Sequence, residues 1–188
     1  ESALADIVSQ AVSREFDRQG HIGIVVGAVV ENEEVLLGFG KSQLGSSEPP
    51  DADTVFEIGS ISKVFTGILL AKKVESAELD LDDPIADRLP EGWTLSDSAR
   101  DIALRHLTTH TSGFPRLPAN LLGISSVFKN LFGGDPYRDY REEAFREALS
   151  SVDLEFEPGT DLLYSNFAVG LLGFLLATQN GTDYGTPL

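Results

Sequence analysis

The distribution of apolar residues predicts an N-terminal helix, then a β-hairpin, then a mostly helical remainder. Over residues 1–18 apolar side chains recur at helical spacing, and Gly20 is placed to end this helix. Residues 21–30 and 34–39 are two β-rich apolar runs, and the polar residues 31–33 between them predict a hairpin turn. The first run is apolar on both faces, which is typical of a strand inside a covered sheet. We therefore expect this strand to have partners beyond the second run, because two strands alone make a poor sheet.

The remainder of the chain has helical periodicity interrupted by loops. The segment 111–140 is rich in glycine and proline, and a loop of this length inside a domain often borders a functional site. Asp82-Asp83-Pro84 predicts the restart of a short helix, since proline is tolerated in a first turn. Longer helices are predicted at 60–76, 101–109, 141–149 and 166–179. The stripe expected to be buried in the first of them comprises Ile61, Val64, Phe65 and Ile68, with Ala71 and the stem of Lys72 as further candidates.

The chain is strongly acidic, with 30 Asp and Glu against 14 Lys and Arg among 188 residues and a net charge of −16. This balance argues against nucleic acid or an anionic membrane as a partner, because both attract basic surfaces. Solubility is the plain explanation of the acidity, and a salt-rich environment is the alternative. There is no cysteine, which excludes disulfides, thiolate metal sites and a cysteine nucleophile. No apolar run reaches transmembrane length; the one at 167–178 is short and broken by glycine.

Ser60 and Lys63 are three residues apart at the predicted start of a helix, a spacing that puts them on one face. A serine is a weak nucleophile until a base takes its proton, and a lysine can do so where burial or a nearby cation lowers its pKa. A serine at a helix N-terminus also offers its backbone N–H to a developing oxyanion. Gly59 permits the close approach of backbone or substrate just before the serine. On its own, the pair is a weak signal and more often indicates an N-cap serine followed by a solvated lysine.

Tyr164-Ser165-Asn166 lies far downstream, just before another predicted helix. A tyrosine can carry a proton to a leaving group, and its pKa falls beside a cationic lysine. The amide of Asn166 can donate to a substrate carbonyl and accept from a lysine. The alternative is structural: Tyr164 packs in the core and Asn166 caps the helix.

Together these residues resemble a known family. Ser60-Ile61-Ser62-Lys63 and Tyr164-Ser165-Asn166 are similar to the first two motifs of class C β-lactamases, their DD-peptidase relatives and related esterases. The first motif is shared with all serine β-lactamases and penicillin-binding proteins. The resemblance spans about residues 20 to 180, and its context also fits in three stretches: 56–59 (FEIG), 104–113 (LRHLTTHTSG) and 158–160 (PGT).

The resemblance implies roles for four residues. Ser60 would form an acyl-enzyme, Lys63 and Tyr164 would share the general-base and general-acid work in an order left open, and Asn166 would orient the substrate carbonyl. It implies no metal and no cofactor. The substrate would be a small molecule or peptidoglycan-like: a β-lactam, a D-alanyl peptide or a small ester. Ser165 slightly favours the peptidase and esterase relatives.

The implied fold is α+β, an α/β sandwich of antiparallel sheet flanked by helices with an added helical region. Residues 1–188 would be the N-terminal part of a single catalytic domain. Within it, residues 1–55 would hold the first helix and two sheet strands, and residues 56–188 the helical region with both motifs. The family's third motif, Lys/His-Thr/Ser-Gly on a strand, is not found after Tyr164. We therefore expect the C-terminal strands and helix to come from another part of the protein, with a C-terminal fragment as a second chain the favoured arrangement.

Two alternatives remain. His106 and His110 are four residues apart and could bind zinc on a helix, but no Glu follows His106 as an HExxH motif requires, and the resemblance makes both structural. A non-catalytic binding module or inactive fragment is the runner-up to a hydrolase, although the intact motif residues argue against it. A periplasmic or secreted location is expected from the family alone.

Overall fold

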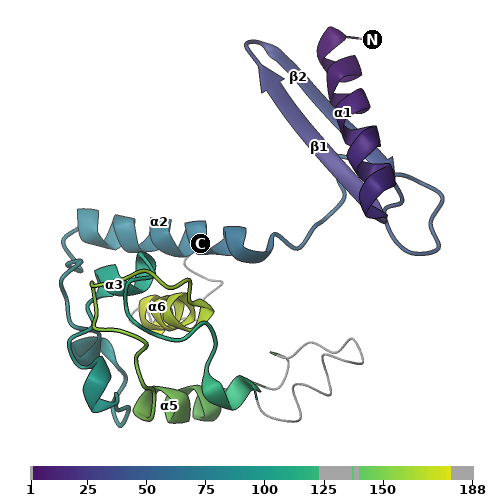
Figure 1. The fold of residues 1–188 in the computed structure, drawn as a ribbon. Helices are drawn as coiled ribbons and strands as arrows, with labels where there is room; N and C mark the ends of the chain where they lie inside the picture. The colour runs from purple at the N-terminus through teal and green to yellow at the C-terminus, as the bar shows by residue number, and fades with distance from the viewer. Residues whose placement is uncertain (1, 123–136, 138–139, 179–188) are drawn as a thin grey trace. The chain divides into compact units, whose positions relative to one another are not determined.

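The structure is a computed structural model that describes residues 2–122, 137 and 140–178. The chain divides into two compact units, residues 1–58 and 59–188 (Figure 1). Helices occur in both units, and the described part of the first contains a two-stranded antiparallel sheet. This mixture of helices and antiparallel strands agrees with the predicted α+β class.

Helix α1, Ala3–Gln19, forms as the N-terminal pattern predicts because both of its ends are capped. Ser2 Oγ accepts a hydrogen bond from the Ala5 backbone N–H at 3.1 Å. Gly20 takes a left-handed conformation with φ 66° and donates its N–H to the Phe16 carbonyl. The helix contacts both strands of the sheet.

The predicted hairpin consists of β1, Gly23–Val30, and β2, Glu33–Gly40, paired from Gly23 opposite Gly40 to Val30 opposite Glu33. The turn is one residue shorter than predicted, and Glu31 within it has a positive φ of 53°. Among the described residues β1 pairs with β2 alone, and Val29 is 69% exposed. The covered sheet expected from its two apolar faces is therefore not present in the described part of the chain.

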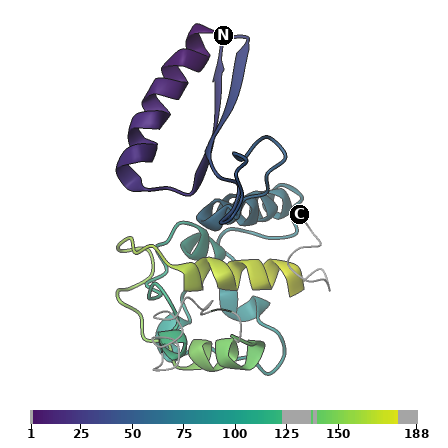
Figure 2. The same ribbon diagram turned by 90° about the vertical axis from the view of Figure 1, so that its right-hand side faces the viewer.

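The second unit is built around helix α6, Asn166–Thr178, which buries nine of its residues. Figures 1 and 2 both show it between helix α2, Ser62–Glu75, on one side and helix α5, Glu142–Ser150, on the other. Helix α3, Leu104–Thr108, also packs against it. Three short 3-10 turns at Ile85–Arg88, Asp97–Ala99 and Ala119–Leu122 connect these helices.

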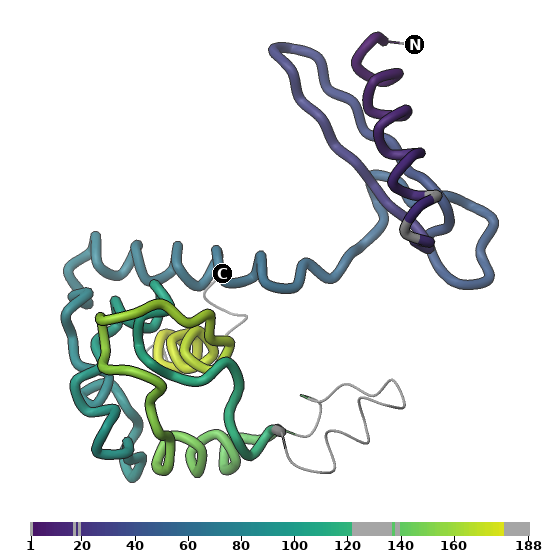
Figure 3. Tube along the Cα trace, viewed as in Figure 1, coloured from purple at the N-terminus to yellow at the C-terminus, as the bar shows by residue number. Residues whose placement is uncertain are grey.

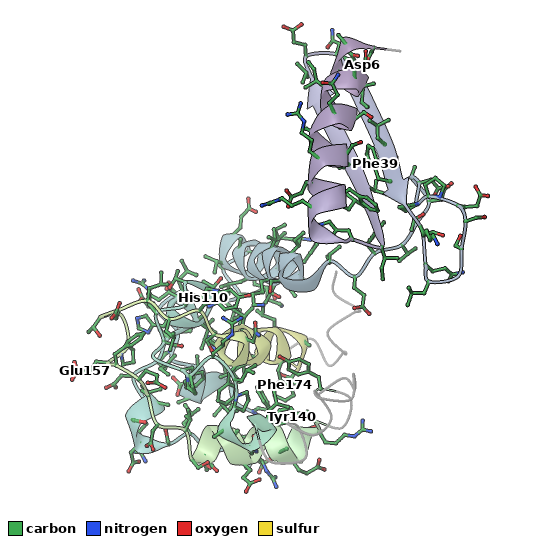
Figure 4. The ribbon with its side chains drawn as sticks, turned by 45° about the vertical axis from the view of Figure 1, so that its right-hand side comes forward. Asp6, Phe39, His110, Tyr140, Glu157 and Phe174 are labelled. Atoms are coloured by element: carbon green, nitrogen blue, oxygen red, sulfur yellow. The ribbon has the colours of Figure 1, made fainter. Side chains whose placement is uncertain are left out.

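Aromatic rings join α5 to α6. Trp93 stacks on Phe174 with ring centroids 4.7 Å apart, and Phe114 stacks on Phe167 at 4.9 Å. Phe145 of α5 meets Phe167 and Phe174 edge-on, at 5.4 and 6.0 Å (Phe174 is labelled in Figure 4). Such ring pairs add to the hydrophobic burial that holds α6 in place.

The predicted buried stripe of α2 is wrong. Ile61, Val64, Phe65 and Ile68 are between 44% and 60% exposed. The residues that α2 buries are Thr66, Leu69, Leu70 and Lys73. They face the unit's own core, while Lys73 also forms an ion pair with Glu78 at 3.0 Å. Apolar residues occur on more than one side of this helix, so periodicity alone did not determine which side would be covered.

The shorter predicted helices are reduced in length. The segment after Pro84 forms a 3-10 turn, and the segment 101–109 is helical only from Leu104. Its first residues instead pair with the chain near Pro84, where the Ile85 N–H donates to the Ile102 carbonyl at 2.9 Å. Of the predicted loop 111–140, residues 123–136, 138 and 139 lie outside the described residues. Within the described part of the chain, no helix is long and apolar enough to cross a membrane.

We predict that replacing Gly113 by alanine destabilises the fold. Gly113 has φ 77°, and an added Cβ would collide with the Phe156 carbonyl and press on Leu154. Left-handed strain and overpacking together should lower the free energy of unfolding by about 2–4 kcal/mol. Urea unfolding of the Gly113→Ala chain measures this change, and Gly67→Ala is the matched control. The nearest atom that a Cβ there would meet is Thr108 Oγ1, at 3.9 Å, so the helical alanine should raise the free energy of unfolding by about 0.5–1 kcal/mol.

Candidate active site around Ser60

Ser60 occupies the middle of a 3-10 turn, Gly59–Ile61, that leads directly into α2. Ser62 Oγ donates to the Gly59 carbonyl at 2.8 Å and fixes this turn. Gly59 has φ 53°, whereas a Cβ there would meet nothing within 4 Å. Glycine is therefore needed at this position for its left-handed backbone conformation. The close approach of other backbone atoms, which was one predicted reason for the glycine, is not seen. The Ser60 side chain is exposed at the surface of the unit.

Ser60 Oγ accepts hydrogen bonds from two side chains. Lys63 Nζ donates from 3.2 Å, one helical turn away, and the Tyr164 hydroxyl donates from 2.7 Å, although it lies 104 residues later in the chain. The three predicted site residues on these two segments thus meet around one oxygen. Either partner could take the proton of the serine hydroxyl once it is itself deprotonated, so the arrangement offers two candidate bases for activating the serine.

Tyr164 lies in a positive environment. Lys63 Nζ is 5.0 Å from the centroid of its ring, and the Arg116 guanidinium carbon is 5.1 Å from the same centroid. A hydrogen bond with Lys63, then one with Ser60, then the charges of Lys63 and Arg116 hold the pKa of Tyr164 below its usual value. The phenolate is therefore easier to form here than at an ordinary surface tyrosine.

Two stretches far apart in sequence hold Tyr164 in place. Residues 110–116 and 155–166 are linked by backbone hydrogen bonds from Gly159 N–H to the Thr111 carbonyl at 2.8 Å and from Asn166 N–H to the Arg116 carbonyl at 3.0 Å. Figure 3 shows both stretches leading toward the start of α6. This pairing lines up the tyrosine before the helix begins.

Ser165, and not Asn166, caps α6. The fully buried Ser165 Oγ accepts from the Ala168 N–H at 2.9 Å and donates to the Pro115 carbonyl at 2.8 Å. The alternative in which Asn166 caps the helix is therefore wrong. Tyr164 is also half-buried at the surface and lies outside the hydrophobic core. The signal for the cap was available, since serine three residues before a helical N–H is a strong N-cap pattern.

Asn166 is the first residue of α6 and borders a cavity that also reaches Lys63. The cavity has a volume of about 600 Å³ and is lined mainly by apolar atoms, with Thr66, Gly170 and Phe174 among its walls. Asn166 Oδ1 is buried and has no hydrogen-bond partner among the described residues. A buried amide oxygen without a partner is costly, so this atom is available to a donor that enters the site.

The two histidines of the 104–113 stretch do not share a helix face. His106 lies in α3, where its Nδ1 accepts from the Ala103 N–H at 3.1 Å. His110 lies beyond the end of α3 with φ 61°, and its ring is 4.5 Å from that of Tyr164 (His110 is labelled in Figure 4). The zinc alternative therefore fails on geometry. The described residues contain no cluster of three histidine or acidic side chains that could hold a metal.

Sequence reasoning missed Arg116 and His110 as neighbours of the site. His110 immediately precedes the predicted loop 111–140 and Arg116 lies within it, and neither is close to Ser60 or Tyr164 in sequence. No local pattern marks a residue that contacts another segment through its ring or its charge. The 104–113 resemblance pointed to this region without assigning it a task.

We predict that Arg116→Gln raises the pKa of Tyr164 toward the ordinary tyrosine value of about 10. The substitution removes one of the cations that favour the phenolate. Alkaline titration of the tyrosinate absorbance, with the Tyr164→Phe curve subtracted, isolates this group among the four tyrosines. Arg100→Gln is the control, since Arg100 is exposed and paired with Asp97 at 2.7 Å. Superimposable titrations of the wild-type and Arg116→Gln chains would contradict the prediction.

The sequence profile of the β-lactamase family matches residues 6–187. The chain is 29% identical over 181 residues to the D-alanyl-D-alanine-carboxypeptidase/endopeptidase AmpH of Escherichia coli K12, covering 96% of this chain and 45% of that protein. It is 28% identical over 181 residues to a β-lactamase of the same strain, covering 96% and 43%. The chain thus spans about half the length of the curated relatives that it matches.

Solved structures give the same picture. A β-lactamase/D-alanine carboxypeptidase from Yersinia pestis, complexed with citrate, superimposes with a TM-score of 0.81 and 26% identity, covering all of this chain and 52% of that one. An octameric penicillin-binding protein homologue from Pyrococcus abyssi superimposes with a TM-score of 0.76 and 26% identity, covering 95% and 40%.

Proposed function

Because the chain belongs to the β-lactamase family, a family of serine hydrolases, we propose that it carries the nucleophilic part of an enzyme that forms an acyl-enzyme at Ser60. One observation carries the proposal: Ser60 Oγ lies within hydrogen-bond distance of both Tyr164 and Lys63.

In the proposed reaction Ser60 Oγ bonds to the carbonyl carbon of an amide or ester as its proton passes to Tyr164 or Lys63. The same pair then returns a proton to the leaving nitrogen or oxygen as the carbonyl bond to it breaks. Water attacks the resulting ester and frees Ser60. The lowered pKa of Tyr164 supports a phenolate that accepts the proton, with Lys63 as the cation that stabilises it.

The Ser60 backbone N–H, in the turn that leads into α2, is our candidate for one donor to the oxyanion. We propose that the second donor, and the third motif of the family, come from polypeptide beyond this chain, as a continuation or as a second chain. Loss of one oxyanion donor costs about a hundredfold to a thousandfold in rate. The chain by itself should therefore react far more slowly than the completed protein.

The substrate is a β-lactam, a D-alanyl peptide or a small ester. The names of the relatives support the first two, and the apolar cavity beside Asn166 fits an acyl group in any of them. A periplasmic or secreted location remains part of the same proposal.

Incubation with a penicillin and, separately, with an activated ester tests the proposal through the intact mass of the protein. We expect a covalent adduct of the acyl group on the peptide that contains Ser60, both for the completed protein and, more slowly, for this chain. Turnover of the penicillin indicates a β-lactamase, whereas a persistent adduct indicates a peptidase. The absence of any adduct on the completed protein would leave the non-catalytic binding module in its place.

A further inference from the structure

His110 has a backbone conformation that few residues adopt. Its φ of 61° is left-handed, a region that disfavours side chains with a Cβ and is tolerated best by glycine and asparagine. His110 is half-buried, directly after the short helix α3. A strained histidine persists only where its surroundings hold it, and such residues gather at functional sites.

Two hydrogen bonds tie His110 to the residues on either side of Tyr164. The His110 carbonyl accepts from the Leu163 N–H at 2.9 Å, and its Nδ1 accepts from the Ser165 N–H at 3.2 Å. The left-handed backbone allows one residue to present both acceptors to the same extended segment, residues 163–165. Tyr164 is therefore bracketed by the backbone and the side chain of a single residue.

The imidazole also contacts the Tyr164 ring. Their centroids are 4.5 Å apart with an interplanar angle of 39°. An Nδ1 that accepts a hydrogen bond carries no proton, so the neutral ring bears its proton on Nε2. Tyr164 in turn donates to Ser60 Oγ at 2.7 Å, so a shift of the phenol ring would move the hydroxyl away from the serine.

We propose that His110 is a positioning residue, which in its neutral form holds Tyr164 against Ser60. Its consequence for catalysis rests on the function proposed above, but the positioning itself does not. Protonation of Nδ1 would turn an acceptor into a donor that faces the Ser165 N–H, and the hydrogen bond between the His110 side chain and Ser165 would be lost. The neutral imidazole is thus the form that keeps the site assembled.

The surroundings favour that neutral form. Burial, and then the charge of Lys63 on α2, lower the pKa of His110 below its ordinary value of about 6.5. The titratable ring that faces it from the 155–166 stretch is that of Tyr164. Since the folded-state pKa is lowered, the contribution to stability is present above about pH 6.5 and is lost as the pH falls through the folded pKa.

His110→Asn and His110→Ala separate the parts of this role. Asparagine adopts left-handed φ readily, and its Oδ1 can take the position of Nδ1 as an acceptor, but it lacks the ring. Alanine lacks both the acceptor and the ring. His106→Asn is the matched control, because His106 Nδ1 also accepts a backbone N–H, whereas the histidine ring that meets Tyr164 is that of His110.

The primary measurement needs no substrate: nitrogen NMR of the three histidines, and titration of Tyr164 by tyrosinate absorbance with Tyr164→Phe subtracted. We expect His110 to be the Nε2-protonated tautomer. His110→Ala should return the pKa of Tyr164 toward its ordinary value, His110→Asn should shift it less, and His106→Asn should leave it unchanged. If His110→Ala fails to fold, the His110→Asn titration decides alone, because the loss of the ring should still move it.

In the completed enzyme, kcat/KM of His110→Ala should fall about 10- to 100-fold through misplacement of the tyrosine, with substantial recovery in His110→Asn. An Nδ1-protonated His110, or a Tyr164 titration that neither variant changes, would overturn the positioning role even if the enzyme is active. If the titrations and the His110 tautomer are as expected but the completed protein is inactive, the proposed function is rejected and the positioning role stands.

Discussion

Ser60→Ala should abolish covalent labelling by penicillin and by activated esters, and should lower kcat/KM of the completed enzyme by about a millionfold. Removal of Oγ removes the nucleophile, which is the oxygen to which both Lys63 and Tyr164 donate, and no alternative route to an acyl-enzyme remains. Loss of a serine nucleophile has an effect of this size in other acyl-transfer enzymes. The measurement is the intact mass after labelling, followed by steady-state kinetics.

Ser62→Ala is the matched control for this experiment. Ser62 is the same residue type in the same turn, but its hydroxyl donates to the Gly59 carbonyl and away from the Tyr164 pair. It should be labelled at a rate within about tenfold of the wild type, since only one exposed hydrogen bond is lost. The free energy of unfolding of both variants should stay within about 1 kcal/mol of the wild-type value. A Ser60→Ala protein that still takes the label would place the nucleophile elsewhere.

The parts of the fold set by local sequence were the most predictable. Helix α1 has a serine cap and a terminal glycine, and the hairpin follows from two apolar runs around a polar turn. The one-turn spacing of Ser60 and Lys63 likewise follows from helix geometry, without any knowledge of the rest of the chain. The position of Tyr164 beside them could be expected only from the family resemblance, because no local pattern relates two residues that are 104 positions apart.

The remaining features depend on packing between segments. Which face of α2 is buried depends on where α6 lies, and a helix with apolar residues on more than one side does not specify this. His110 was expected to be structural, and its contact with Tyr164 arises from a left-handed residue at the end of a five-residue helix. Tertiary contacts made through backbone acceptors leave little trace in composition or periodicity. For this reason the resemblance indicated the region but not the contact.

Tyr164→Phe and Lys63→Gln should each lower kcat/KM of the completed enzyme by about 10²- to 10⁴-fold, the usual contribution of a general acid or base. Both side chains hydrogen-bond to Ser60 Oγ, and the first cause of the lowered Tyr164 pKa is its hydrogen bond with Lys63. Each single change therefore removes much of what the other residue provides. The double variant should be only slightly slower than the slower single one, in place of the product of the two losses.

The lowered pKa of Tyr164 also predicts the direction in which activity changes with pH. Activity that needs the Tyr164 phenolate rises with pH and levels off above the pKa of that group, which lies below the ordinary tyrosine value of about 10. Lys63→Gln removes the main partner that stabilises the phenolate, so the rise in activity should move to higher pH. Tyr164→Phe should abolish this rise. Tyr140→Phe is the matched control: its hydroxyl donates to Asn120 Oδ1 at 2.8 Å, and burial raises its pKa to about 12.

The comparison of the two single variants with the double variant distinguishes two mechanisms for the Ser60 site. If the two losses multiply, Lys63 and Tyr164 act on different steps, for instance with Lys63 taking the proton of Ser60 and Tyr164 returning one to the leaving group. If they do not multiply, the pair handles a single proton as one unit, with the ammonium stabilising the phenolate that accepts it. Because Ser60 Oγ, Lys63 Nζ and the Tyr164 hydroxyl share one set of hydrogen bonds, and because Arg116 adds a second cation over the same ring, we expect the second result. Lys72→Gln, on an exposed position of the same helix, should change neither the rate nor the pH at which activity rises.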